Sequence, residues 1–127
     1  MSTHKQYQFS VSVETAFVPD QSDEAQNRFV FSYTITITNT GNVAAQLISR
    51  HWIITDANEQ VQEVRGLGVV GAQPLLQPGE HFQYTSGTVL PTQVGTMHGS
   101  YQVTAEDGTQ FEASIPAFTL SVPRVLH

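Results

Sequence analysis

The chain has 127 residues, a formal net charge of −6 and no cysteine. Its length fits one domain with a real core, and the lack of cysteine excludes a disulfide framework, cysteine-ligated zinc and a thiol nucleophile. Only five basic residues, scattered along the chain, oppose 11 acidic ones, which argues against direct nucleic-acid binding. We find no apolar run that could span a membrane and no secretory signal at residues 1–6, so we expect a cytoplasmic protein.

The first third of the chain shows the alternation of half-buried β-strands. Residues 7–13 alternate apolar and polar side chains, and the polar segment 19–24 breaks this pattern. Residues 29–38 alternate most clearly, with Ser and Thr on one face. The other face, which we expect to lie in the core, carries Phe29, Phe31, Tyr33, Ile35 and Ile37.

A third strand is expected from about residue 45 to residue 55. Its predicted core face carries Ile48, Trp52 and Ile54, so Trp52 should be a core residue. The segment 56–59 has the composition of a hairpin turn and leads into a fourth strand over residues 60–65.

The second half of the chain repeats this pattern of short strands and turns. A turn over residues 76–80 precedes a short strand around residues 82–84. Residues 96–105 alternate again, and Glu-Asp-Gly-Thr at 106–109 is a strong hairpin signal. It leads into apolar positions spread over residues 111–122.

Seven or eight short strands with regular turns predict an all-β fold. We expect a two-sheet antiparallel sandwich of immunoglobulin-like or fibronectin type III-like architecture, because no segment has the period of an amphipathic helix. We find neither an internal repeat nor a linker, so residues 1–127 should form a single domain. Loosely held tails are expected near residues 1–5 and 124–127.

Residues 66–71 read Gly-Leu-Gly-Val-Val-Gly, the G-x-G-x-x-G string of dinucleotide-binding loops. That motif requires a following helix, whose N-terminal amides hold the pyrophosphate. Pro74 and Pro78 exclude such a helix here. Two interpretations remain: a structural loop that uses glycine for positive φ, or a nest of backbone amides that binds an anion.

The predicted hairpin gives one argument for the anion. If residues 57–58 form a two-residue loop, Arg50 lies opposite Arg65 and Trp52 lies opposite Glu63. Like charges facing each other on one sheet face are destabilising, and a bound anion would remove that cost. Alternatively, Glu63 or another acid neutralises the pair, or the register slips by one residue and turns every side chain over.

Several ordered strings in the chain resemble the bacterial ApaG family, also called CorD. They lie at residues 49–56, 61–71, 78–80, 84–87, 95–101 and 115–118. The resemblance implies a fibronectin type III-like sandwich and a genetic link to cobalt tolerance and magnesium flux. It also implies kinship with domains of a eukaryotic F-box protein and a polymerase-delta-interacting protein, where they look like interaction modules. The family has no established catalytic activity.

The remaining side chains suggest no catalytic or metal chemistry. The five histidines lack metal-ligand spacing, and no nucleophile motif is present, so we expect no enzyme, no cofactor and no metal site. We expect instead a non-catalytic binding module for a protein partner, itself a monomer or a weak homodimer. The alternative is a binder of a phosphorylated ligand, which would be held by Arg50, Arg65, Gly66, Gly68 and Gly71.

Overall fold

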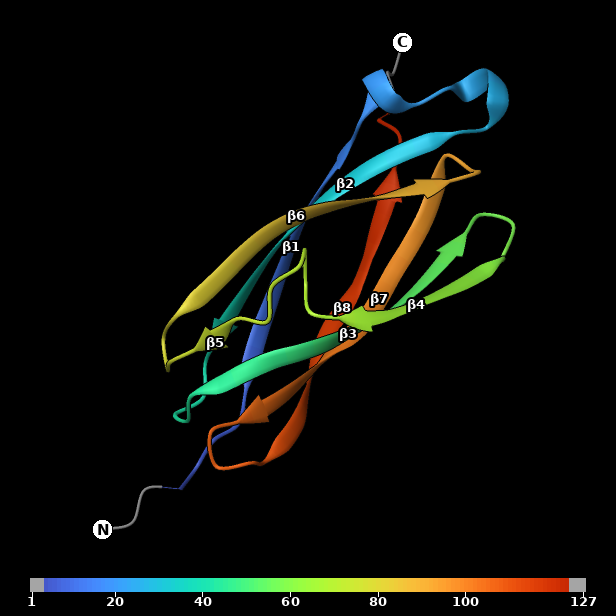
Figure 1. Cartoon of the computed structure of the whole chain (residues 1–127). Helices are drawn as coiled ribbons and strands as arrows, with labels where there is room; N and C mark the ends of the chain where they lie inside the picture. The colour runs from blue at the N-terminus through green and yellow to red at the C-terminus, as the bar shows by residue number, and fades with distance from the viewer. Residues whose placement is uncertain (1–3, 124–127) are drawn as a thin grey trace.

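The structure, a computed structural model, describes residues 4–123, and these form two antiparallel β-sheets (Figure 1). The first sheet has the order β1-β2-β6, with β1 at Phe9–Phe17, β2 at Phe29–Asn39 and β6 at His81–Leu90. The second sheet has the order β4-β3-β7-β8, with β4 at Val61–Leu67, β3 at Ala45–Asp56, β7 at Val94–Ala105 and β8 at Gln110–Ser121. The predicted all-β, two-sheet antiparallel sandwich is confirmed.

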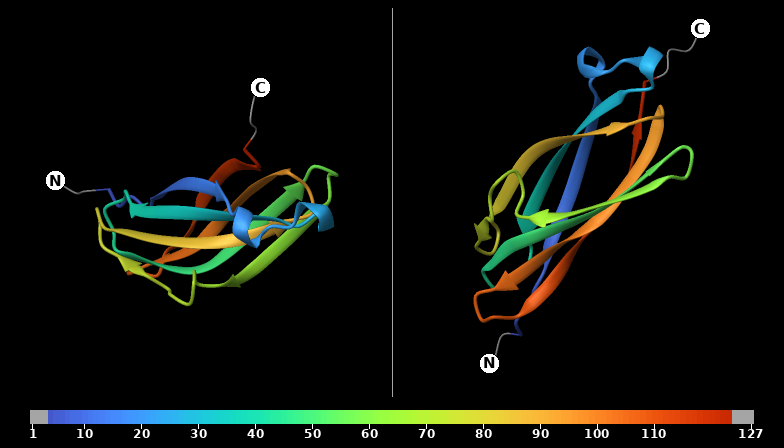
Figure 2. Two further views of the ribbon diagram at one scale, coloured as in Figure 1. Left: turned by 90° about the horizontal axis from the view of Figure 1, so that it is seen from above. Right: turned by 45° about the vertical axis from the view of Figure 1, so that its right-hand side comes forward.

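Three short elements lie outside this frame. The two-residue strand β5, Leu75–Leu76, pairs with the start of β3. Two single-turn 3-10 helices, η1 at Pro19–Gln21 and η2 at Glu24–Gln26, occupy the polar connection between β1 and β2. Figure 2 shows that this connection lies at one end of an elongated domain. None of the helices within residues 4–123 is long and apolar enough to cross a membrane.

The core lies between the two sheets, and β2 supplies much of it. The five predicted core residues of β2, from Phe29 to Ile37, are all buried, while its threonines lie on the outer face and are only half-buried. Trp52 on β3 is 2 % exposed. Its indole ring lies 5.4 Å from the ring of Tyr33 and 5.9 Å from that of Phe118, measured between centroids. The prediction that Trp52 is a core residue is confirmed.

The predicted face of the third strand was wrong at Ile48. The ladder between β3 and β7 shifts between Leu47 and Ser49, so Ile48 is an extra residue and β3 carries a β-bulge. Before the bulge, Leu47 lies in the core; after it, Trp52 does. An extra residue changes the phase of the alternation. Arg50, two residues before Trp52, therefore takes an inward position.

One long margin of the sandwich, between β1 and β8, is closed by aromatic packing. The ring of Phe111 lies 5.9 Å from that of Tyr7 and 5.7 Å from that of Phe9. The carboxylate of Asp107, in the β7–β8 turn, accepts hydrogen bonds from the Tyr7 hydroxyl and from Lys5 Nζ. Of the tails expected to be loose, residues 1–3 and 124–127 lie outside the described residues, whereas Lys5 is held by this contact.

Two turns confirm their sequence signals, and the last strand continues through a proline. Gly108, at φ +88°, occupies the tight β7–β8 turn, and Gly79, at φ +86°, occupies the turn before β6. The last strand, β8, passes through Pro116 without interruption. Pro116 is tolerated because β8 is an edge strand, in which one backbone donor can be missing, and because the β7–β8 ladder shifts register beside it.

Candidate functional site

The β3–β4 hairpin sets the geometry of the candidate site, and its predicted register was wrong. The amide of Asp56 donates to the carbonyl of Gln60, which closes a loop of three residues rather than two. Glu59 has φ +63°, the left-handed conformation that ends such a loop. As a result Arg50 pairs with Gly66, and Arg65 pairs with His51. The one-residue slip left open by the sequence is therefore the register found.

This register separates the two arginines. Opposed residues of two paired strands share a face of the sheet, and successive residues of one strand alternate between faces. Arg50 is opposed to Gly66, the residue after Arg65, so Arg50 points inward and Arg65 points outward. Arg65 is 72 % exposed, and its Nη2 lies 3.7 Å from Glu63 Oε2. The same carboxylate oxygen lies 3.6 Å from His51 Nε2. Arg65 thus has an acidic neighbour, and no repulsion between the arginines needs a bound anion.

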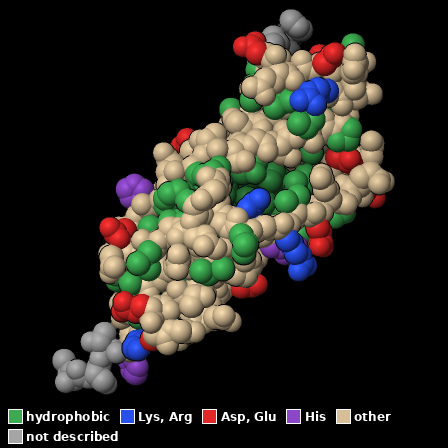
Figure 3. All heavy atoms as spheres, in the orientation of Figure 1, with side chains coloured by type: hydrophobic (Ala, Val, Ile, Leu, Met, Phe, Trp, Pro, Cys, Tyr) green, Lys and Arg blue, Asp and Glu red, His purple; other side chains and the backbone are tan. Residues whose placement is uncertain are grey.

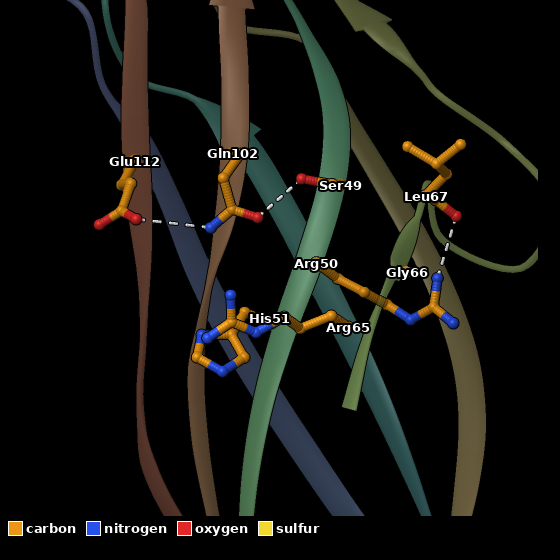
Figure 4. A pocket seen from close by; sticks show the side chains of 8 residues that line it. All are labelled: Ser49, Arg50, His51, Arg65, Gly66, Leu67, Gln102 and Glu112. Atoms are coloured by element: carbon orange, nitrogen blue, oxygen red, sulfur yellow. Dashed lines mark hydrogen bonds between the residues drawn. The ribbon is translucent and has the colours of Figure 1, made fainter. Parts of the chain in front are cut away.

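The outer face of the second sheet carries a hollow of about 620 Å³ beside this hairpin (Figure 4). Three of the polar side chains that line it, Ser49, Gln102 and Glu112, are linked by hydrogen bonds. Ser49 Oγ donates to Gln102 Oε1 at 2.7 Å, and Gln102 Nε2 donates to Ser100 Oγ at 2.9 Å. Within the described range no three His, Asp or Glu side chains are grouped so that they could hold a metal ion. We call this space the outer hollow.

A second, smaller hollow of about 140 Å³ lies between the sheets and contains the Arg50 side chain. We call it the Arg50 hollow. In the view of Figure 3, hydrophobic side chains surround a depression between β6 and the β3–β4 hairpin, with a basic side chain inside it. The residues that line the hollow around Arg50 are Tyr33, Trp52, Val69, Val70, Tyr84 and Ser86.

Arg50 is held in place by the backbone of the glycine-rich segment. Its Nη1 donates to the carbonyl oxygens of Leu67 and Gly68, at 3.0 and 2.8 Å. The guanidinium lies directly against Gly66, where an added Cβ would come within 2.8 Å of Nη2. Any larger residue at position 66 would displace the arginine, so this glycine serves a close approach rather than a turn.

The glycine-rich loop itself turns tightly and uses several of its amides internally. Gly68, Val70 and Gly71 all have positive φ, at +65°, +43° and +81°. The amide of Gly68 donates to the carbonyl oxygen of Ile48. The amide of Val69 donates to the carbonyl of Ala72, and the amide of Ala72 donates to the carbonyl of Val69. The structure therefore brings Gly66 and Gly68 to Arg50, but places Arg65 on the outer face and Gly71 at the solvent-exposed end of the loop.

Two buried tyrosines join the sheets behind the Arg50 hollow. The hydroxyls of Tyr84, on β6, and Tyr101, on β7, are hydrogen-bonded to each other. Burial raises the pKa of Tyr84 to about 12 and raises the pKa of Tyr101 further. Both side chains are neutral at physiological pH, and Arg50 finds no counter-charge in them.

Three exposed hydrophobic residues lie on the hairpin, loop and short strand next to Arg50, and one of them, Val70, lines the Arg50 hollow. Leu67, Val70 and Leu75 are 75 %, 59 % and 57 % exposed. We call these three residues the apolar rim. Leu67 ends β4, Val70 lies in the glycine loop and Leu75 begins β5. Alternation along the strands could not have marked them, because it predicts burial wherever leucine and valine recur.

The packing of two antiparallel sheets and their hairpin connections define the class of this protein: an immunoglobulin-like or fibronectin type III-like β-sandwich domain. The family model described as "ApaG domain" matches residues 19–105. The chain belongs to the ApaG domain family.

Relatives match it over the whole length. Protein ApaG of Methylobacillus flagellatus is 72 % identical over 100 % of both chains, and Protein ApaG of Thiobacillus denitrificans is 65 % identical over 100 % of both. The crystal structure of the putative ApaA protein from Bordetella pertussis is similar with a TM-score of 0.92 and 60 % identity, covering 95 % of this chain and 98 % of that one.

Proposed function

We propose that this chain is a non-catalytic binding module that engages a protein partner through the side of the sandwich between β4 and β6. The observation that carries the proposal is the apolar rim. Leu67, Val70 and Leu75 are each more than half exposed and lie within nine positions of the sequence, and Val70 lines the hollow that holds the Arg50 side chain. Exposed apolar groups that gather on one side of a protein mark interaction sites, and arginine is enriched in protein–protein interfaces.

The family supplies the cellular context of this proposal. The relatives described above come from bacteria, and we place the protein in the bacterial cytoplasm. The ApaG resemblance adds a genetic link to cobalt tolerance and magnesium flux, which a binding module would serve through its partner rather than through a bound ion. Without that partner we expect a monomer or a weak homodimer, and no cofactor.

Binding of a phosphorylated ligand at the glycine-rich loop stays a prediction. In its favour, the amides of Val70 and Gly71 donate no hydrogen bond within the described part of the chain. Against it, the amides of Gly68 and Val69 are already engaged. Titration with pyrophosphate or a dinucleotide polyphosphate, followed by amide NMR, tests it. Shifts confined to Val70 and Gly71 would support it, and an unchanged spectrum at millimolar ligand would remove it.

Partner capture by matched variants tests the leading proposal. The tagged protein is purified from its own bacterium, and co-purifying proteins are identified by mass spectrometry. We expect the double variant Leu67→Ser, Leu75→Ser to lose a partner that the unmodified protein retains. Val94→Ser is the control: Val94 is also an exposed hydrophobic residue, but it pairs with Ser121 on β8, away from the rim. Equal capture by both variants would contradict the proposal.

A further inference from the structure

Arg50 is a half-buried positive charge without an acidic partner. Among residues 4–123 no carboxylate lies within 4.0 Å of its guanidinium, although the chain carries a net charge of −6. Two backbone carbonyls satisfy Nη1 but bring no negative charge. A half-buried guanidinium with no carboxylate nearby has lost part of its hydration without gaining a counter-charge, which favours an anion from outside.

The Arg50 hollow also contains hydrogen-bond donors that the protein leaves free. Arg50 Nε and Nη2 form no hydrogen bond within the described range, and neither do the hydroxyls of Tyr33 and Ser86, which line the same space. The Nε and Nη2 groups of one arginine form a planar fork that matches the two oxygens of a carboxylate. The free donors are therefore those that a carboxylate needs.

The size of the hollow restricts the occupant. Pockets for small-molecule ligands have volumes of roughly 300–1,000 Å³, and the Arg50 hollow has about 140 Å³. It can accept a carboxymethyl or carboxyethyl group but not a nucleotide. Apolar walls from Trp52 and Val69 suit the methylene part of such a group, and Val70 of the apolar rim lines the same hollow.

We propose that the Arg50 hollow binds the side-chain carboxylate of an Asp or Glu residue presented by the partner protein. The inference rests on the proposed function and names the chemistry of the partner's anchor residue. The carboxylate would accept two hydrogen bonds from Arg50 Nε and Nη2 and a third from the Tyr33 or Ser86 hydroxyl. Contacts of the apolar rim would then exclude water from this charged pair, the arrangement in which a single anchor dominates an interface.

A titration with a minimal probe tests the pocket without the partner. The probe is N-acetyl-glutamate N-methylamide, whose only charge is the side-chain carboxylate, and its control is the isosteric N-acetyl-glutamine N-methylamide. We follow the Arg50 Nε–H and Trp52 indole N–H resonances of the full chain. Trp52 is the only tryptophan, so its fluorescence gives a second readout. We expect saturable shifts with the glutamate probe and affinity at least about tenfold weaker for the glutamine probe.

Two matched arginine variants locate the effect. Arg50→Lys keeps the charge but loses the fork, and it should weaken binding about tenfold. Arg65→Gln removes a charge from the outer face a few residues away and should leave the affinity unchanged. If Arg50→Lys does not fold, Tyr33→Phe serves instead, since it keeps the ring against Trp52 and should weaken binding roughly threefold.

Three outcomes would overturn the inference. The first is an absence of shifts at Arg50 and Trp52 up to millimolar probe, and the second is equal binding of the glutamine probe. The third is tighter binding of inorganic phosphate than of the glutamate probe at the same resonances, which would assign the site to a free phosphate. None of these affects partner capture through Leu67 and Leu75, so failure of the pocket and failure of the proposed function are distinguishable.

Discussion

The two long margins of the sandwich differ in how the space between the sheets is filled. Between β1 and β8, Phe111 packs against two other rings, and Asp107 holds the segment that leads into β1. Between β4 and β6, no backbone ladder or aromatic stack joins the sheets within residues 4–123; Arg50 and the glycine-rich loop occupy the space instead.

This difference indicates that one margin serves stability and the other serves binding. The closed margin buries apolar surface and contributes stability. The open margin keeps a charged side chain, exposed leucines and a valine at φ +43°, all of which cost stability or contribute none. Strain and exposed apolar groups persist where function needs them. We expect substitutions to separate stability from binding along this line.

Trp52 should give the largest effect, because it belongs to the core shared by both margins. Replacing it by alanine removes contacts with the rings of Tyr33, Tyr101 and Phe118. We expect Trp52→Ala to lower the free energy of unfolding by about 3–5 kcal/mol. Urea denaturation followed by circular dichroism measures it. A loss below about 1 kcal/mol would mean that the packing around the indole is not as described.

A pair of variants compares the margins directly. Phe111→Ala, on the closed margin, should lower the free energy of unfolding by about 2 kcal/mol, since it removes two aromatic contacts from a partly buried ring. Leu67→Ala, on the open margin, should change it by less than about 0.5 kcal/mol, because that side chain is 75 % exposed. The same urea titration serves for both. Similar losses would remove the contrast between the margins.

Val70→Gly should raise stability while it weakens partner binding. Glycine relieves the left-handed strain at φ +43°, worth roughly 1–2 kcal/mol, but adds entropy to the unfolded chain, so we expect a net gain of about 0.5–1 kcal/mol. The control is Val94→Gly, in a strand, which should destabilise by about 1 kcal/mol. If both variants destabilise equally, the loop is not strained.

The smallest effect concerns pH and the closed margin. The Tyr7 hydroxyl, followed by the Thr109 amide and Lys5, holds the pKa of Asp107 well below its usual 3.8. Because the folded-state pKa is depressed, the stabilisation is complete above pH 3.8 and is lost as pH falls toward the folded-state value. Urea melts at a series of acidic pH values should show a shallower fall for Asp107→Asn than for the unmodified protein, and Tyr7→Phe should have a weaker version of the same effect. Parallel profiles would exclude this contribution.

Elements whose pattern is local could be predicted from the sequence. The alternation from Phe29 to Ile37 marked the core face of β2, since a strand with one buried face must repeat every two residues. Gly79 and Gly108 marked two turns, because both positions have the positive φ that glycine adopts without steric cost. Trp52 was placed in the core because the same two-residue alternation puts it on one face of its strand with Ile54.

The candidate site depended on features with no local signal. Glu59 adopts positive φ without being glycine, which lengthened the hairpin loop and shifted its register. The extra residue at Ile48 changed the phase of β3 and so decided that Arg50 points inward. The bulge coincides with long-range bonds, such as that from Leu47 to the Pro74 carbonyl, which no window of sequence around Ile48 contains.

Pro116 also bears on how copies of this protein meet in a crowded cell. It lies in β8, the outermost strand on its side of the second sheet. Because proline carries no backbone N–H, this strand lacks one donor of the row that another strand would need to extend the sheet. Edge-to-edge association of molecules along β8 is thereby disfavoured. The surface that remains for binding other proteins is the margin that carries Arg50.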